Sequence, residues 1–200
     1  VIEMNLSEDV KIVKCRKNVY KAYSVILALG SHPRELKIEG EEKFKGQGVS
    51  YCALCDGNFF KNKNVAVVGS GDSAFSDALY LANICSKVYV LTKENLKLHN
   101  YAEDELNNFS NISLLKGAFS KSIKGDNKLE KITYMQNNIE KEIDVDGVFV
   151  AIGRTPDTDL LNGQIELNEQ GYIKSDSKMK TSLDGVYVCG DVREGNIKQI

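Results

Sequence analysis

The sequence predicts an α/β fold in which buried strands alternate with helices. An apolar run at residues 65–68 leads through a glycine-rich turn into a helical pattern over residues 72–83, and a second apolar run follows at residues 88–91. Short apolar runs indicate buried strands, and their alternation with a helix is typical of βαβ units around a parallel sheet. A further helix is expected over residues 103–109, and further strands at residues 112–115, 131–136 and 147–152.

The segments on either side of this region suggest a second domain. Residues 10–15 and 20–29 are each typical of a strand and are joined by a basic turn. Residues 32–48 are polar and rich in Glu, Lys and Gly, which favours a surface connection between domains. A strand at residues 185–189 ends a polar C-terminal stretch that resembles a return to the first domain.

Composition places the chain among globular proteins and excludes two classes of partner. It has 42% hydrophobic and 27% charged residues, enough to bury a core, and a net charge of -2, so no basic surface favours nucleic acid or anionic lipid. No apolar run reaches the roughly 20 residues that span a bilayer, so we expect no membrane contact and a cytoplasmic location. Because the chain opens at Val1, we expect it to be an excerpt of a longer protein.

A glycine-rich loop stands where dinucleotide-binding folds hold a pyrophosphate, between a strand and a helix. There the first glycine permits a tight turn, the second lets the backbone approach the phosphates, and a small sixth residue allows close helix–strand contact. The helix N-terminus then faces the anion. Glycines after a strand also make simple turns, so a structural reading stays open. The loop reads Gly69-Ser70-Gly71-Asp72-Ser73-Ala74.

Nucleotide specificity is expected at the end of the next strand, at Thr92, Lys93 and Glu94. An acid at this place accepts hydrogen bonds from ribose hydroxyls, whereas a basic group accommodates a 2′-phosphate. Lys93 suits a phosphate and the adjacent Glu94 repels one, so these residues leave the choice between NADPH and NADH open.

Cys52 and Cys55 are the only two of the five cysteines at close spacing, and Asp56 follows them as a proton donor or acceptor. Thiol–disulfide exchange needs one thiol to attack and another to resolve, which a Cys-x-x-Cys pair provides. A zinc half-site and two inert buried thiols are the alternatives, but no second close Cys or His pair completes a zinc site, and no metal is expected. The other cysteines are expected in the core and both histidines at the surface: Cys15, Cys85, Cys189, His32 and His99.

Four segments together resemble the bacterial low-molecular-weight thioredoxin reductases. Residues 44–57, FKGQGVSYCALCDG, resemble the redox-site segment of that family. The resemblance continues through residues 67–74, 147–153 and 185–192, which read VVGSGDSA, GVFVAIG and GVYVCGDV. It therefore covers nearly the whole chain.

The resemblance implies two Rossmann-like domains arranged as three-layer ββα sandwiches. In such enzymes FAD lies in a split outer domain, and NADPH lies in an inserted domain that also carries the Cys-x-x-Cys pair. Residues 1–40 and 154–200 are then parts of the FAD-binding domain, and residues 41–153 form the NAD(P)-binding domain. The N-terminal loop that holds the FAD pyrophosphate in the family is not found in these residues, so the chain by itself is expected to bind FAD poorly.

Residue by residue, the resemblance assigns Cys55 to the flavin side, Cys52 to attack on the thioredoxin disulfide, and Asp56 to proton handling. It matches Gly190 and Asp191 to the pair at the FAD ribityl chain. The remaining cofactor-binding candidates are Gly30, Lys198 and Gln199 for the flavin, Gly69, Gly71, Asp72, Ser73, Ala74, Thr92 and Lys93 for the nucleotide, and Ile152, Gly153 and Arg154 without assignment to either cofactor.

The implied function is an oxidoreductase, a thioredoxin-disulfide reductase that is a homodimer when full length. Electrons pass from NAD(P)H through FAD to the Cys52/Cys55 disulfide and on to thioredoxin. The sequence departs from the family's basic specificity motif, offering Thr92, Lys93, Glu94 and Leu98. A reductase fed by ferredoxin therefore remains as an alternative. A redox-inactive nucleotide-binding domain, in which Cys52 and Cys55 form no reversible disulfide, is a second one.

Overall fold

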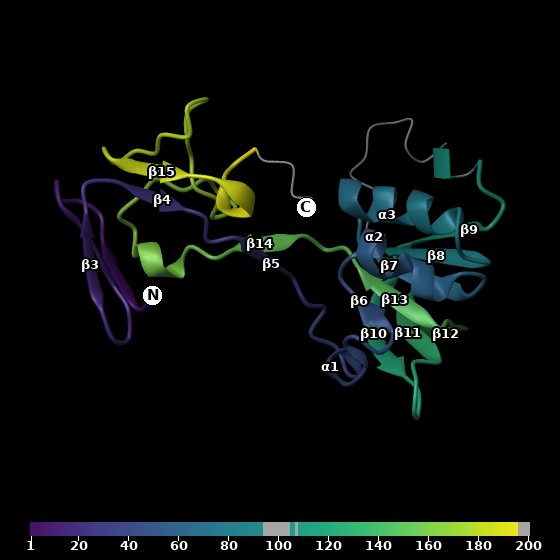
Figure 1. The fold of residues 1–200 in the computed structure, drawn as a ribbon. Coiled ribbons are helices and arrows are strands. Elements are labelled where there is room, and N and C mark those ends of the chain that lie inside the picture. The colour runs from purple at the N-terminus through teal and green to yellow at the C-terminus, as the bar shows by residue number, and fades with distance from the viewer. Residues whose placement is uncertain (94–104, 107, 196–200) are drawn as a thin grey trace. The chain divides into compact units, whose positions relative to one another are not determined.

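The computed structural model describes residues 1–93, 105–106 and 108–195. The chain divides into two compact units (Figure 1). Unit 1 comprises Val1–His32 and Arg154–Ile200, and unit 2 comprises Pro33–Gly153.

Unit 2 is built on a parallel sheet of five strands. The strand order is β6-β13-β7-β8-β9, and every neighbouring pair is parallel. This sheet confirms the predicted α/β class. The strands are β6 (Val49–Ser50), β7 (Asn64–Val68), β8 (Lys87–Thr92), β9 (Ile112–Lys116) and β13 (Gly147–Val150).

Both faces of the parallel sheet are buried, which explains why its strands are continuous apolar runs. On β7, Val65 and Val67 face one hydrophobic core, and Ala66 and Val68 face another, because successive side chains point to opposite faces. Helix α3 (Asp72–Ala82) packs in the first core. The sheet is thus the middle layer of a three-layer arrangement (Figure 1).

The third layer is an antiparallel sheet of β10 (Phe119–Lys124), β11 (Lys131–Gln136) and β12 (Ile139–Asp144). Only β11 is predicted from the sequence. The other two strands alternate polar and apolar residues weakly, and β12 is exposed almost throughout, so neither forms the apolar run that marked the parallel strands.

The segment that enters unit 2 makes close contacts with it, and the compact unit begins at Pro33. The buried Glu41 carboxylate accepts hydrogen bonds from the backbone N–H groups of Leu36 and Lys37 at 2.9 and 2.7 Å. Gly40 lies so close to β10 that a Cβ there would stand 1.9 Å from the Ile123 carbonyl oxygen. These contacts explain why residues 33–40 belong to unit 2 rather than to a free linker.

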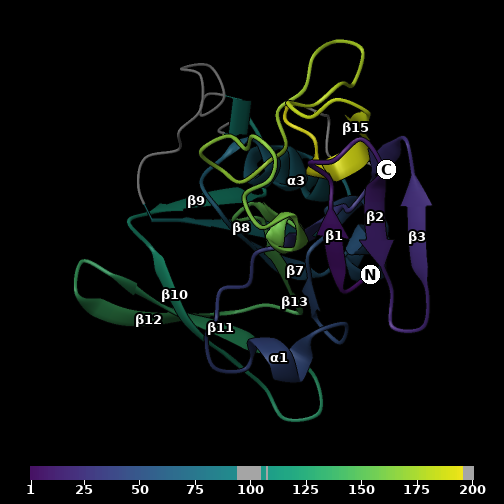
Figure 2. The same cartoon turned by 90° about the vertical axis from the view of Figure 1, so that its left-hand side faces the viewer.

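The described residues of unit 1 form three small sheets. Figure 2 shows the antiparallel strands β1, β2 and β3 side by side. The run at residues 20–29 forms two strands rather than one, because its first part pairs antiparallel with β2 and its second part pairs parallel with β15. The strands are β1 (Glu3–Asn5), β2 (Lys11–Lys14), β3 (Val19–Ala22), β4 (Val25–Leu27), β5 (Ser31–Pro33), β14 (Arg154–Pro156) and β15 (Val186–Val188).

A separate core closes unit 1, with Leu27, Ile173 and Val188 among its buried members. Among the described helices, none is both long and apolar enough to cross a membrane. Among the described residues, no group of three or more His, Cys, Asp or Glu side chains could hold a metal ion.

Candidate active site

Four candidate segments lie at one edge of the parallel sheet of unit 2. Because parallel strands all end at the same edge, the residues that follow β6, β13, β7 and β8 share it. Open α/β sheets bind ligands outside the carboxyl ends of their strands, next to the place where the strand order reverses. In this sheet the order reverses at β7, whose neighbours are β8 and the much later β13. The segments are Cys52–Cys55 after β6, Ile152-Gly153 after β13, Gly69-Ser70-Gly71 after β7 and Lys93 after β8.

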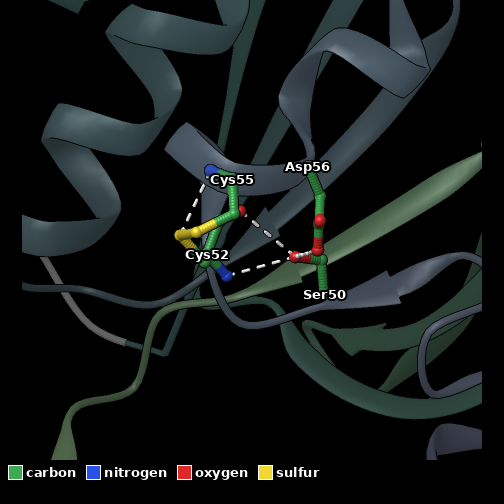
Figure 3. The surroundings of a disulfide bond; sticks show 4 residues. All are labelled: Ser50, Cys52, Cys55 and Asp56. Carbon is green, nitrogen blue, oxygen red and sulfur yellow. Dashed lines mark hydrogen bonds between the residues drawn. A yellow bond between two sulfur atoms is a disulfide. The ribbon is translucent and has the colours of Figure 1, made fainter. Parts of the chain in front are cut away.

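The two closely spaced cysteines form a disulfide, with a sulfur–sulfur distance of 2.08 Å (Figure 3). Cys52 caps the short helix α2 (Ala53–Asp56), and its sulfur accepts a hydrogen bond from the backbone N–H of Cys55 at 3.2 Å. Cys52 is half-buried and Cys55 is exposed. With each sulfur bonded to the other, neither is a free zinc ligand in this structure.

Asp56 contacts Ser50, a residue that the sequence motifs do not single out. The Ser50 hydroxyl donates to the Asp56 carboxylate at 2.6 Å and accepts from the backbone N–H of Cys52 at 3.1 Å (Figure 3). Ser50 is buried at the end of β6, with 6% of its surface exposed. Its only sequence signal is its position two residues before the first cysteine.

The two glycines of the glycine-rich loop serve different purposes. A Cβ at Gly69 would stand 2.2 Å from the Ala151 carbonyl oxygen and 2.8 Å from the Ala74 Cβ, so this glycine is required by close packing. Gly71 caps α3 without a side-chain hydrogen bond, and a Cβ there would meet nothing within 4 Å. Its backbone is open at the helix N-terminus, which fits an approaching pyrophosphate.

The remaining nucleotide candidates differ in exposure. Asp72 and Ser73 are exposed in the first turn of α3. Thr92 is fully buried, whereas Lys93 is exposed. The side chain available to a ligand at the end of β8 is therefore that of Lys93. Glu94 and Leu98 lie outside the described residues, as does His99.

The structure brings several flavin-side candidates together in unit 1. The Arg154 guanidinium donates to the Ser31 hydroxyl at 2.8 Å and lies 3.9 Å from the Asp191 carboxylate. Gly30 and Gly190 have positive φ angles of 78° and 72°, and a Cβ on either would meet nothing within 4 Å. Exposed backbone at two strand ends suits a large cofactor that approaches the main chain closely, so these residues fit a flavin. Lys198 and Gln199 lie outside the described residues.

The other cysteines and His32 show no comparable cluster among the described residues. Burial raises the pKa of the Cys85 thiol to about 11, which keeps it protonated and unreactive. The expectation of a core position is wrong for Cys189, which is exposed, and for the half-buried Cys15. His32 is exposed as expected, and its ring contacts the Asp157 carboxylate at 2.8 Å.

Known proteins that resemble this chain agree with the features of the site. A family model described as pyridine nucleotide-disulphide oxidoreductase matches residues 2–200. The thioredoxin reductase of Peptoclostridium acidaminophilum is 34% identical over 209 residues, covering 100% of this chain, and the chain spans 66% of that protein's length.

Two solved structures are also similar. The thioredoxin reductase of Lactococcus lactis, in its FR conformation, matches with a TM-score of 0.83 and 30% identity, covering 99% of this chain and 67% of that one. A ferredoxin-flavin thioredoxin reductase from Clostridium acetobutylicum matches with a TM-score of 0.51 and 33% identity, covering 98% and 63%. From its glycine loop, its disulfide and these matches, the chain belongs to the pyridine nucleotide-disulphide oxidoreductase family, on the thioredoxin reductase branch.

Proposed function

We propose that this chain serves a thioredoxin reductase-like flavoenzyme that passes electrons from a reduced nicotinamide nucleotide to the Cys52–Cys55 disulfide and on to thioredoxin. One observation carries the proposal. The disulfide and the glycine loop lie at the same carboxyl edge of one parallel sheet. A redox-inactive nucleotide-binding domain would need the loop but has no use for the disulfide.

The cysteines perform the exchange with the protein substrate. Reduction of their disulfide takes up two electrons and two protons and yields two thiols. We assign the attack on the thioredoxin disulfide to Cys52, which forms a mixed disulfide and expels one thioredoxin sulfur as a thiolate. Cys55 then attacks the Cys52 sulfur, which reforms the internal disulfide and releases reduced thioredoxin.

We assign the cofactors to separate units. Unit 1, with Gly30, Gly190 and Asp191, is proposed to hold FAD, which when bound supplies two-electron exchange between a hydride donor and a dithiol. Unit 2, with the glycine loop, Ile152 and Gly153, is proposed to hold the nucleotide. Because residues 33–40 are fastened to unit 2, we place the domain boundary between His32 and Pro33. Arg154, a cofactor-binding candidate from the sequence, contacts Ser31 in unit 1, and we assign it to the flavin side.

The electron donor has two candidates. The exposed Lys93 supports NADPH, since an ammonium group at this position attracts a 2′-phosphate. The similarity to a ferredoxin-flavin thioredoxin reductase supports ferredoxin as the second candidate.

An anaerobic titration of the full-length, FAD-loaded protein separates these donors. The flavin absorbance is followed during addition of NADPH and, separately, of NADH. We expect NADPH to bleach the flavin, and Lys93→Ala to weaken NADPH much more than NADH. Bleaching by dithionite alone would move the assignment to ferredoxin, and a full-length protein that binds no FAD would overturn the reductase function.

The partner surface is also a proposal. Leu54 lies between the two cysteines in the sequence and Phe59 follows Cys55 by four residues, with 54% and 74% of their surfaces exposed. Exposed apolar side chains beside a reactive group are typical of a docking surface, and we assign this one to thioredoxin. A cytoplasmic homodimer, as expected from the sequence, completes the proposal, and gel filtration of the full-length protein tests the dimer.

A further inference from the structure

Ser50 makes three contacts that join Asp56 to Cys52. Its hydroxyl oxygen lies 2.6 Å from the Asp56 carboxylate, 3.1 Å from the Cys52 backbone nitrogen and 3.3 Å from the Cys52 carbonyl oxygen. A hydroxyl has one proton to donate and lone pairs to accept with. The carboxylate is the nearer and stronger acceptor, so the proton points to Asp56 while the oxygen accepts from Cys52.

These contacts close a ring with the helix backbone. The Asp56 N–H donates to the Cys52 carbonyl oxygen at 3.1 Å, so Asp56 is tied to Cys52 once through the main chain and once through Ser50. Hydrogen bonds in such a chain strengthen one another, because a hydroxyl that donates to a carboxylate is a better acceptor. The carboxylate and the main chain of the attacking cysteine are therefore held in one geometry (Figure 3).

We propose that Ser50 is a positioning residue for the thiol–disulfide chemistry of Cys52 and Cys55. It acts by orienting the Asp56 carboxylate and by fixing the backbone of Cys52 at the start of α2. This proposal rests on the proposed function, since it assigns Ser50 to the same reaction. The burial of Ser50 supports it, because its hydroxyl is shielded from water that would otherwise compete for its bond to the half-buried Asp56 carboxylate.

Unit 2 offers a matched control for the loss of a buried hydroxyl. Ser122, on β10, is 5% exposed against 6% for Ser50, and its hydroxyl lies 2.6 Å from that of Thr133. Truncation of Ser122 removes a 2.6 Å hydrogen bond, as truncation of Ser50 does, but the partner is Thr133 on β11 rather than a residue of the disulfide segment. Comparing the two serines separates positioning from general loss of packing.

The experiment measures the reduction of the Cys52–Cys55 disulfide by dithiothreitol in the full-length protein, across a range of pH. Because dithiothreitol is a chemical reductant, the result is independent of whether NADPH, NADH or ferredoxin is the donor. We expect Ser50→Ala to slow reduction roughly tenfold or more, the effect of one charge-assisted hydrogen bond, and to alter its pH profile. Ser50→Thr, which keeps the hydroxyl, should restore the rate to within about threefold, and Ser122→Ala should stay within about twofold.

Two outcomes would overturn the proposal. Equal rates for Ser50→Ala and Ser122→Ala would leave Ser50 with a packing role only, and a folded Ser50→Thr as slow as Ser50→Ala would show that the hydroxyl does not act. Should Ser50→Ala fail to melt cooperatively, the reduction rate of Ser50→Thr compared with that of the unmodified protein tests the proposal.

A double-mutant cycle adds a further test. In an Asp56→Asn background, loss of the Ser50 hydroxyl should slow disulfide reduction little further, whereas fully additive effects on the rate would contradict the coupling.

Discussion

The two sheets of unit 2 share one hydrophobic core, but their exposed edges differ. At the carboxyl edge of the parallel sheet, chain segments approach so closely that Gly69 leaves no room for a Cβ. On the antiparallel sheet, strand β12 is almost wholly exposed, and its Glu140 and Glu142 pair with Lys121 of β10 and Lys131 of β11. Charges on an edge strand discourage further strand pairing without fixing a geometry. The candidate chemistry thus lies where chain segments pack closely, and substitutions there should have larger effects than substitutions on the exposed strand β12.

Gly69→Ala should give the largest effect. The new methyl group meets the Ala151 carbonyl oxygen, a backbone atom that cannot turn aside, so we expect a loss of roughly 1–3 kcal/mol in unfolding free energy and a loss of nucleotide binding. Urea denaturation and nucleotide titration measure the two effects.

Gly71→Ala is the matched control for Gly69→Ala. Its φ of −111° is open to any residue and its Cβ meets nothing within 4 Å, so stability should change by less than about 0.5 kcal/mol. Nucleotide binding should still weaken, because the methyl group occupies the space into which the pyrophosphate fits. Equal stability losses in the two variants would contradict the division of roles between these glycines.

The difference between the two sheets also explains which of their strands the sequence predicts. The parallel strands are predictable because burial on both faces makes each an apolar run, as at residues 65–68. Strands β10 and β12 are not, because half-exposed strands carry polar residues and their pairing is decided by tertiary contacts. The glycine loop and the cysteine pair have fixed spacings that carry chemical meaning. The role of Ser50 and the lack of space at Gly69 have no such spacing. Both depend on contacts between atoms that only the folded chain brings together.

Two carboxylates on opposite sides of the parallel sheet show pKa shifts of opposite sign. Burial on α3 raises the pKa of Asp77 to about 6, whereas the hydrogen bond from Lys131 lowers the pKa of Glu142. Because the folded-state pKa of Asp77 lies above its unfolded value, folding is favoured while the group is protonated, and stability falls as the pH rises from about 4 to about 6.

Asp77→Asn removes this penalty. The variant should be more stable than the unmodified protein at pH 7.5 by roughly 1–2 kcal/mol, after discounting for partial exposure, and equally stable near pH 4. Thermal melts at the two pH values measure the difference. A stability difference that is the same at both would refute burial of the charge as the cause.

Two exposed aromatic side chains allow thioredoxin binding to be compared between the disulfide segment and the antiparallel sheet. Phe59 lies in the short 3-10 helix that directly follows α2, and Phe119 lies on β10, with 74% and 49% of their surfaces exposed. Phe59→Ala should raise the KM for thioredoxin roughly tenfold, the effect of losing one aromatic contact, with little change in unfolding free energy. Phe119→Ala should leave the KM unchanged. A rise in both variants would indicate that the docking surface is not confined to the disulfide edge.

The smallest effect is expected on the antiparallel sheet itself. The Lys131 ammonium lies 2.8 Å from the Glu142 carboxylate, but both groups face solvent, where salt screens them and side-chain entropy opposes the pairing. Glu142→Gln should therefore lower the Tm by no more than about two degrees in low salt and not measurably in 1 M salt. Since the pairing lowers the pKa of Glu142, its contribution is present near neutral pH and is lost as the pH falls through the folded-state pKa, so the variant and the unmodified protein should converge in acid. A larger shift that persists in high salt would mean that β12 is held by its charges as firmly as the carboxyl edge is held by its packing, and the contrast between the two sheets would then fail.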